Sequence, residues 1–367
     1  MNIAIFANTP AQVHFYKNIM LNLEEHGHQV MLLVRNYGET LEVANEFGLE
    51  YAIHSNPSSS KAGKIILLPW ELLKTYNILR RKFKPDLVSG FGVYDAFTSV
   101  LLGSRCIEFT DSEPKINNLA YATQFRLYMP FVDAIITPET FTDDLGRKQI
   151  RVNSFKELAY LHPHYFKPDW KIKEMLSLEK DEEYVLLRFN AFDAVHDLGI
   201  DGFSAKDKVL LVKEIENYAK VFISSEAGVP DAIKDRVMKI PKSKIHDAIY
   251  YAKMLITDTQ TMATEAALLG TPAIRRNHFV GPNDMGNFIE LEKNYGMIFN
   301  YREPDRVINK AIELIQRNNL KKEWNEKRER LLRDKIDITA FMVWIIENYP
   351  ECVGTLKHNP EISNRFR

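Results

Sequence analysis

Residues 257–277, TDTQTMATEAALLGTPAIRRN, have the types and spacing that would hold an anion. The pattern predicts a strand that ends at Thr257 and a helix that begins near Thr261. The backbone N–H groups at such a helix start, with the hydroxyls of Thr259 and Thr261, form a site suited to a pyrophosphate. Glu265, four residues into the helix, can accept hydrogen bonds from both hydroxyls of a ribose. The alternative is an ordinary strand–helix–strand unit whose threonines cap the helix.

A histidine lies close behind the first predicted strand. Residues 8–14, NTPAQVH, follow that strand and place His14 at the start of the first predicted helix. A histidine there suits proton transfer because its pKa lies near neutral pH. The alternative is a polar residue in the first turn of a helix.

Three carboxylates follow later predicted strands of the same half of the chain. Asp95 ends the glycine-containing loop GFGVYD, where it could orient a base or cap a helix. Asp111 and Glu113, in the loop TDSE, could contact acceptor hydroxyls or supply a base. The alternative is that Asp111 and Glu113 are solvated carboxylates of a loop.

Arg188 ends a predicted strand in the second half of the chain and precedes Asn190 in the following loop. A guanidinium at this position would neutralise a departing β-phosphate without a metal ion. A surface ion pair is the alternative. The chain has no HExxH, DxD or CxxC pattern, so we expect neither an obligatory metal nor a cofactor.

The elements that must position these residues are short buried strands alternating with helices. This alternation predicts right-handed crossovers and two mostly parallel sheets. The predicted strands are residues 3–7, 30–34, 87–89, 106–109 and 134–136 in the first half, and 184–187, 221–224, 254–257 and 272–274 in the second. Helices are predicted at residues 261–269, 304–317 and 321–333, and Gly27 is placed to end the first helix.

A chain of 367 residues is too long for one ordinary core, so two domains are expected. The aromatic and proline-rich junction at residues 161–168 separates them, which gives domains at 1–165 and 166–335. Apolar residues spaced by three and four predict a last helix at 336–350. We expect this helix to pack back on the first domain, because its apolar face needs a partner.

The composition excludes several classes of protein. Hydrophobic content of 45% and charged content of 26% are typical of a globular protein. A net charge of −1 gives no reason to expect a nucleic-acid partner. Two distant cysteines, no visible signal peptide and no apolar run of membrane-spanning length predict a cytoplasmic protein, with contact at a membrane surface left open.

The segment at 257–277 resembles the donor-binding motif of GT-B glycosyltransferases and of the related non-hydrolysing UDP-N-acetylglucosamine 2-epimerases. The whole chain resembles a prokaryotic family of unknown function in this superfamily, through NTPAQVHFYK near the start and KELAYLHPHYFKPD at the junction. The resemblance implies a GT-B fold, an α/β architecture of two Rossmann-like domains whose parallel sheets face each other across a cleft.

The resemblance also implies roles for individual residues. The helix start, Thr259-Gln260-Thr261, would hold the diphosphate, although Thr259-Gln260 replaces the usual glycine pair, and Glu265 would hold the ribose. Many inverting GT-B enzymes have a histidine placed like His14, which takes the proton from the acceptor hydroxyl. Acidic residues occupy the region of Asp111 and Glu113 in the epimerases. The remaining implied donor contacts are Ile245, near the base, and Asn283 and Asp284, near the sugar.

The function expected on these grounds is transfer of a sugar from a nucleoside diphosphate, with UDP as the expected carrier. The acceptor would be a hydroxyl of a saccharide or a lipid-linked molecule, in the synthesis of surface polysaccharide or glycolipid. A nucleotide-sugar 2-epimerase and a non-catalytic sugar-nucleotide-binding or assembly protein are the alternatives.

Overall fold

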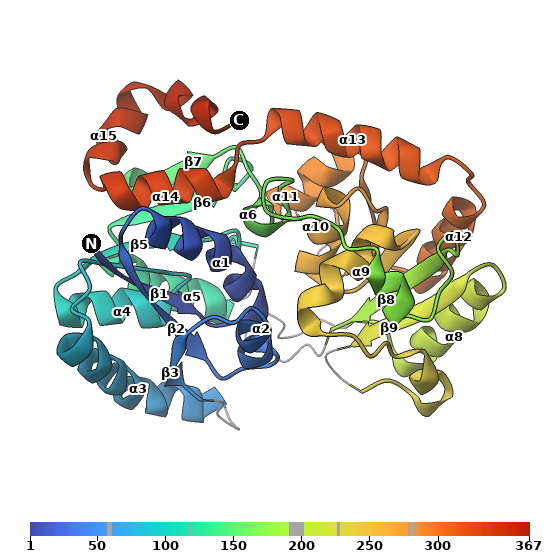
Figure 1. Ribbon diagram of the computed structural model, residues 1–367, viewed down its shortest axis with the longest axis horizontal. Helices are drawn as coiled ribbons and strands as arrows, with labels where there is room; N and C mark the ends of the chain where they lie inside the picture. The colour runs from blue at the N-terminus through green and yellow to red at the C-terminus, as the bar shows by residue number, and fades with distance from the viewer. Residues whose placement is uncertain (57–60, 117–118, 191–201, 226–227, 278–279, 282–283) are drawn as a thin grey trace. The chain divides into compact units, whose positions relative to one another are not determined.

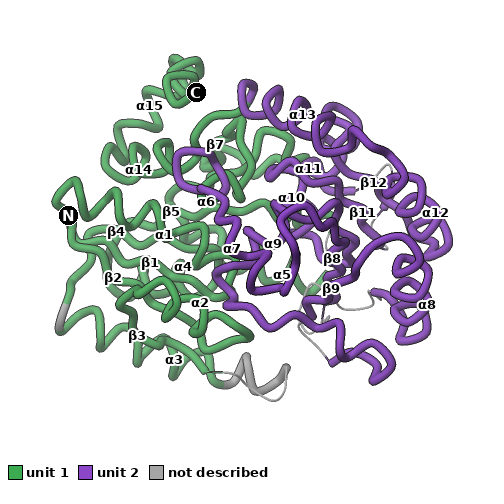
Figure 2. Tube along the Cα trace, turned by 45° about the vertical axis from the view of Figure 1, so that its right-hand side comes forward, with its two compact units in different colours: residues 1–160, 335–367 green, residues 161–334 purple. Residues whose placement is uncertain are grey.

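The computed structural model describes residues 1–367 except 57–60, 117–118, 191–201, 226–227, 278–279 and 282–283. The described chain forms two compact units (Figure 2). Unit 1 comprises Met1–Tyr160 and Lys335–Arg367, and unit 2 comprises Leu161–Asp334. The chain therefore passes from one unit to the other twice. Each unit contains its own parallel sheet (Figure 1).

Unit 1 is built on a seven-stranded parallel sheet with the order β3-β2-β1-β4-β5-β6-β7. Residues 3–7 of the central strand β1 are completely buried, as expected for a strand covered on both faces. The strands are β1 (Asn2–Ala7), β2 (Gln29–Arg35), β3 (Tyr51–Ser55), β4 (Leu87–Gly90), β5 (Arg105–Phe109), β6 (Ala134–Pro138) and β7 (Gln149–Val152).

Helices cover both faces of this sheet. The reversal of strand order at β1, with right-handed crossovers, puts α1 and α2 on one face and α3, α4 and α5 on the other. Neighbouring helices of each layer pack together, α1 with α2 and α3 with α4 (Figure 1). The helices are α1 (Pro10–Glu25), α2 (Thr40–Glu46), α3 (Lys61–Lys82), α4 (Val93–Leu102), α5 (Leu119–Tyr128), α6 (Leu158–Leu161), α14 (Ile338–Asn348) and α15 (Glu351–His358), with the short turn η1 (Met129–Phe131) after α5.

The C-terminal segment belongs to unit 1, where α14 packs on α1. Asp337 caps α14 by accepting a hydrogen bond from the backbone N–H of Ala340. The Thr339 hydroxyl donates to the carbonyl oxygen of Ala159 at 3.0 Å. Phe341 and Ile345 are fully buried, so the apolar face of this helix is covered within unit 1.

Unit 2 is built on a five-stranded parallel sheet with the order β12-β11-β10-β8-β9. Its strands are β8 (Tyr184–Phe189), β9 (Lys220–Ser225), β10 (Met254–Thr257), β11 (Ala273–Arg276) and β12 (Ile298–Tyr301). Its α-helices are α7 (Lys171–Met175), α8 (Ala205–Glu216), α9 (Ile245–Tyr251), α10 (Gln260–Leu268), α11 (Gly286–Ile289), α12 (Pro304–Ile315) and α13 (Leu320–Asp334).

The nine predicted strands are present, most with ends moved by one or two residues. Gly27 has φ of 83° just beyond α1, which confirms its position at the helix end. Three strands were missed: β3, β7 and β12. All three lie at the edge of a sheet and mix polar with apolar residues, so they lack the continuous apolar run of a buried central strand.

Across the part of the chain that the structure describes, no helix is both long enough and apolar enough to cross a membrane.

Candidate functional site

The first group of candidate residues lies at the carboxyl end of β10 in unit 2, where α10 begins. Open parallel sheets bind ligands at this edge. Thr259 is the N-cap residue of α10, but its side chain caps no helix N–H group. Its hydroxyl instead bonds the hydroxyl of Thr257 at 2.8 Å. Gln260 and Thr261, in the first turn, are partly exposed. The positive end of α10 therefore carries no side-chain cap from Thr259 and suits an anion.

Arg188 lies beside this helix start. It occupies the carboxyl end of β8, next to β10, and pairs in register with Thr257. Its guanidinium is buried and donates a hydrogen bond from Nη1 to the hydroxyl of Ser224 at 2.5 Å. The Arg188 cation and the start of α10 thus lie at the carboxyl ends of two neighbouring strands, β8 and β10. Together they favour a negatively charged group there.

Asp258, between the two threonines, was not among the predicted site residues. Its carboxylate accepts hydrogen bonds from the backbone N–H of Asn190 at 2.8 Å and of Phe203 at 3.1 Å. Burial raises the pKa of Asp258 to about 6, although these backbone donors oppose the shift. Asp258 therefore fixes two loop positions and carries less negative charge near neutral pH than an exposed aspartate. Its position between Thr257 and Thr259, directly after a predicted strand, is the sequence feature that could have indicated a site residue.

Glu265 lies inside α10 and contacts a histidine of the neighbouring helix. Its Oε1 is 3.0 Å from Nε2 of His246, and both side chains are buried. His246 is the second residue of α9, directly after the predicted site residue Ile245. The structure thus brings Glu265 and the start of α9 together, although 19 residues separate the bonded pair in sequence. His246 was missed because nothing in its own segment pointed to this partner.

Asp284 forms a buried ion pair with Arg275. The Nε of Arg275 also donates to Oδ1 of Asn300 at 2.8 Å, and the guanidinium lies 3.7 Å from the centre of the Phe288 ring. Burial raises the pKa of Asp284 while Arg275 opposes the shift. This carboxylate therefore has a structural partner within unit 2. Asn283, its predicted companion, lies outside the described residues.

In unit 1, His14 lies in the second turn of α1 and is buried. Its ring packs edge-on against Phe47, with centroids 5.0 Å apart, and lies 5.2 Å from the ring of Tyr160. These two aromatic rings hold the imidazole in position. Fixed orientation is a requirement for a group that transfers protons.

Asp95 caps α4, as its alternative interpretation expected. Both of its carboxylate oxygens accept from the backbone N–H of Gly92 at 3.1 Å. A Cβ atom at Gly90 would lie 2.3 Å from the carboxyl carbon of Asp95, so only glycine fits there. The fully buried Glu108 of β5, which sequence reasoning missed, is the electrostatic neighbour of Asp95.

Burial raises the pKa of Asp95 to about 6 and raises the pKa of Glu108 further above its usual range, because the Asp95 charge adds to the cost. Because the charge of each carboxyl group opposes ionisation of the other, the two groups titrate as a pair. Cys106 Sγ completes a group of three donor atoms within 4.8 Å of one another, a set that could also hold a small cation.

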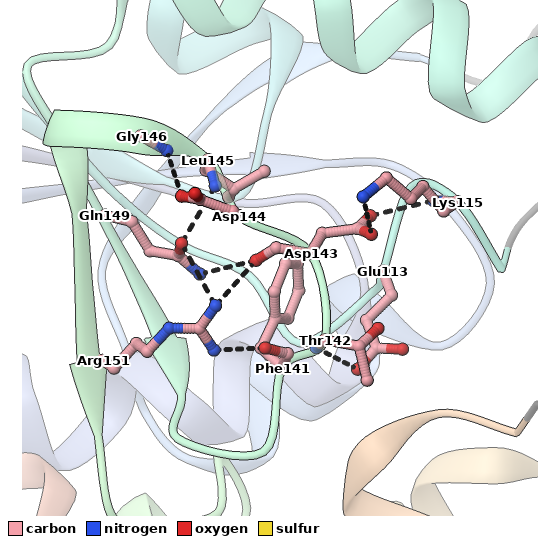
Figure 3. Close-up of polar contacts among 10 residues, drawn as sticks. All are labelled: Glu113, Lys115, Phe141, Thr142, Asp143, Asp144, Leu145, Gly146, Gln149 and Arg151. Carbon is pink, nitrogen blue, oxygen red and sulfur yellow. Dashed lines mark hydrogen bonds and ion pairs between the residues drawn. The ribbon is translucent and has the colours of Figure 1, made fainter.

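Asp111 and Glu113, in the loop after β5, both have partners in unit 1. Asp111 forms an ion pair with Lys156, with the two charged atoms 2.6 Å apart. Glu113 is buried and accepts a hydrogen bond from the backbone N–H of Thr142 at 3.0 Å (Figure 3). The same two loops are joined again by the ion pair of Lys115 with Asp143. Glu113 therefore ties the loop after β5 to the loop after β6.

Comparison with known proteins shows the family to which the sequence belongs. Residues 1–349 match the model of a family described as "Protein of unknown function (DUF354)". The chain belongs to DUF354. No curated protein matches the sequence.

Solved structures share the fold of this DUF354 chain. The UDP-GlcNAc 2-epimerase from Neisseria meningitidis bound to UDP-GlcNAc matches with a TM-score of 0.68 and 14% identity, over 95% of this chain and 100% of that one. The UDP-GlcNAc 2-epimerase from Methanocaldococcus jannaschii matches with a TM-score of 0.60 and 15% identity, over 87% and 94%. The glycosyltransferase SsfS6 from Streptomyces sp. SF2575 matches with a TM-score of 0.59 and 12% identity, over 95% and 100%.

These neighbours are GT-B glycosyltransferases and UDP-GlcNAc 2-epimerases. The GT-B fold expected from the sequence is thereby confirmed for this DUF354 chain. At this level of identity the likeness establishes the fold and leaves the reaction to be argued from the residues.

Proposed function

We propose that this protein is a metal-independent glycosyltransferase. It would move a sugar from a UDP-sugar to a hydroxyl of a saccharide or lipid-linked acceptor, in the synthesis of surface polysaccharide or glycolipid. The observation that carries the proposal is the sheet edge of unit 2, where Arg188 lies on the strand beside Thr257 and the start of α10 has no side-chain cap. These groups supply positive charge where a diphosphate would be held and released.

In the proposed reaction, the acceptor oxygen bonds to the anomeric carbon of the sugar while the bond from that carbon to the diphosphate oxygen breaks. The electron pair leaves with UDP, and Arg188 and the N–H groups at Gln260 and Thr261 stabilise its charge. His14 accepts the proton of the acceptor hydroxyl. Glu265 would hold the ribose, and the start of α9 at Ile245 would lie against the base.

Transfer is favoured over epimerisation by the partners of the unit 1 carboxylates. An epimerase needs acid and base groups on both sides of the sugar. Asp95 caps α4, Asp111 pairs with Lys156, and Glu113 accepts from Thr142. Each of these carboxylates already has a hydrogen-bond or ion-pair partner within unit 1. Transfer requires a single base, and His14 has that role in the proposal.

The test is to incubate the purified protein with a panel of UDP-sugars and follow the products by NMR and mass spectrometry. Release of UDP, with transfer to an added acceptor, supports the proposal. An isomerised nucleotide-sugar would establish an epimerase instead. Binding of UDP-sugar with no turnover against a broad acceptor panel would indicate the non-catalytic alternative.

Two substitutions separate donor binding from proton transfer. Arg188→Met should weaken UDP binding at least tenfold, while Arg333→Met, at an exposed position on α13, should leave it unchanged. His14→Gln should lower turnover by roughly 10²-fold with little change in UDP affinity. Wild-type turnover in the histidine variant would remove the role of His14 as the base.

A further inference from the structure

The helical layer formed by α3, α4, α5 and η1 has a charge unlike that of the whole chain. The chain has 48 Lys and Arg against 49 Asp and Glu. Among the residues of these four helices whose side chains the structure describes, by contrast, four are Lys or Arg and only two are acids, Glu71 and Asp95. Positive charge is therefore concentrated on one side of the unit 1 sheet.

Neither acid is an exposed side chain at the surface. Asp95 is fully buried in the cap of α4. Glu71 is partly buried and accepts hydrogen bonds from the hydroxyl of Tyr94 at 2.7 Å and from the backbone N–H of Asn56 at 3.2 Å. Exposed cations on the same helices are Lys74, Arg80, Arg81 and Arg126.

The same layer also exposes large apolar side chains. Of the fourteen large hydrophobic residues that are exposed in the described part of the chain, eight lie on these helices. Trp70 on α3 is 72% exposed and Leu127 on α5 is 64% exposed. Leu73, Val100, Leu101 and Phe131 belong to the same set, and the Phe131 ring lies 5.5 Å from that of Phe97 on α4. A surface that combines cations with an exposed tryptophan and leucines has the chemistry of a membrane-interface element.

We propose that this layer, the outer surface of α3, α4, α5 and η1, docks on an anionic lipid bilayer. Trp70 and the exposed leucines would enter the headgroup region, and the cations would lie against lipid phosphates. A second copy of the chain fits less well, because a symmetric interface would bring two cationic surfaces together. The inference goes beyond the proposed function and does not depend on it.

The experiment is cosedimentation of the full chain with vesicles of phosphatidylcholine alone, or of phosphatidylcholine mixed equally with phosphatidylglycerol. We expect binding to the mixed vesicles only, and weaker binding as salt is raised. Two double variants test the two kinds of contact: Trp70→Gln with Leu73→Gln, and Arg80→Gln with Arg81→Gln. Each should lower the fraction of bound protein at least tenfold.

Matched controls come from unit 2. Trp170→Gln removes another exposed tryptophan, and Lys234→Gln with Lys239→Gln removes two other exposed cations, so neither should alter binding. Thermal melting checks that every variant is folded. Absence of vesicle binding by the wild type, or binding by both double variants equal to that of the wild type, would overturn the proposal. A dimer that the variants dissociate, seen by light scattering without vesicle binding, would assign the surface to a second copy instead.

Discussion

At the residue scale, the polar groups of this protein act in pairs whose members lie far apart in the sequence. Glu265 was expected to hold a ribose, and the structure shows its carboxylate 3.0 Å from His246. Replacing Glu265 by alanine would therefore take a hydrogen-bond partner from the buried His246 and would also remove the proposed contact with the ribose. A substitution that keeps the shape of the side chain is the better test.

We expect Glu265→Gln to weaken UDP binding by roughly 10- to 100-fold, because a hydrogen bond to a charged group contributes about 1.5–3 kcal/mol. Isothermal calorimetry with UDP measures this change, and Glu313→Gln, on the exposed side of α12, is the control. Unchanged affinity in Glu265→Gln, with an unchanged melting temperature, would remove the ribose assignment.

The Asp95–Glu108 pair predicts how stability depends on pH. Because burial raises both pKa values, the folded state keeps protons that the unfolded chain releases. The contribution of this pair to stability is therefore greatest below the usual carboxyl pKa of about 4 and is lost as pH rises through about 6 and above. Tyr16, Tyr128 and Cys106 also surround the pair, and burial raises the pKa of each, so all three stay neutral and leave the charge of the two acids unbalanced.

We expect Glu108→Gln to reduce the change of melting temperature with pH between pH 5 and pH 8, since it removes one of the two acids. Melting temperatures of the wild type and the variant, measured from pH 5 to pH 8, make the comparison. Glu139→Gln, at an exposed loop position after β6, is the control. A wild type whose melting temperature rises across this range, with the variant following in parallel, would contradict the raised pKa values of this pair.

At the scale of elements, α10 and α14 show two uses of a helix. The start of α10 leaves its dipole available to a ligand, because the Thr259 hydroxyl bonds Thr257 and not the helix. The start of α14 is capped by Asp337, and its apolar face is buried in unit 1. The first arrangement favours binding and the second favours stability.

We expect Phe341→Ala in α14 to lower the free energy of unfolding by about 3–5 kcal/mol, because it empties a fully buried aromatic site. Chemical denaturation measures the loss. Tyr218→Ala, at a position that is 48% exposed, should change stability by about 0.5 kcal/mol or less. Equal effects of the two substitutions would show that α14 contributes little to unit 1.

At the scale of the molecule, unit 2 is one continuous segment whereas unit 1 is made from two segments. The unit 2 sheet, Arg188 and α10 all lie within residues 161–334. Residues 1–160 alone, by contrast, lack α14, which packs on α1. The two fragments should therefore behave differently when produced separately.

We expect the fragment 161–334 to fold and to bind UDP, and the fragment 1–160 to be unstable unless residues 335–367 are supplied. Circular dichroism reports folding, and calorimetry reports UDP binding. A folded fragment 161–334 with no affinity for UDP would show that the nucleotide site needs residues outside unit 2.

The sequence by itself determined the central strands, the parallel α/β architecture and a helix that begins near Thr261, one residue after the observed start of α10 at Gln260. These follow from apolar periodicity and turn residues, which act over a few neighbouring positions. The edge strands β3, β7 and β12 had no such pattern. Only the tertiary structure decided which groups meet: Asp258 with Asn190 and Phe203, Glu265 with His246, and Asp95 with Glu108. Such pairs depend on how the sheet orders its strands, and a local pattern carries no information about that order.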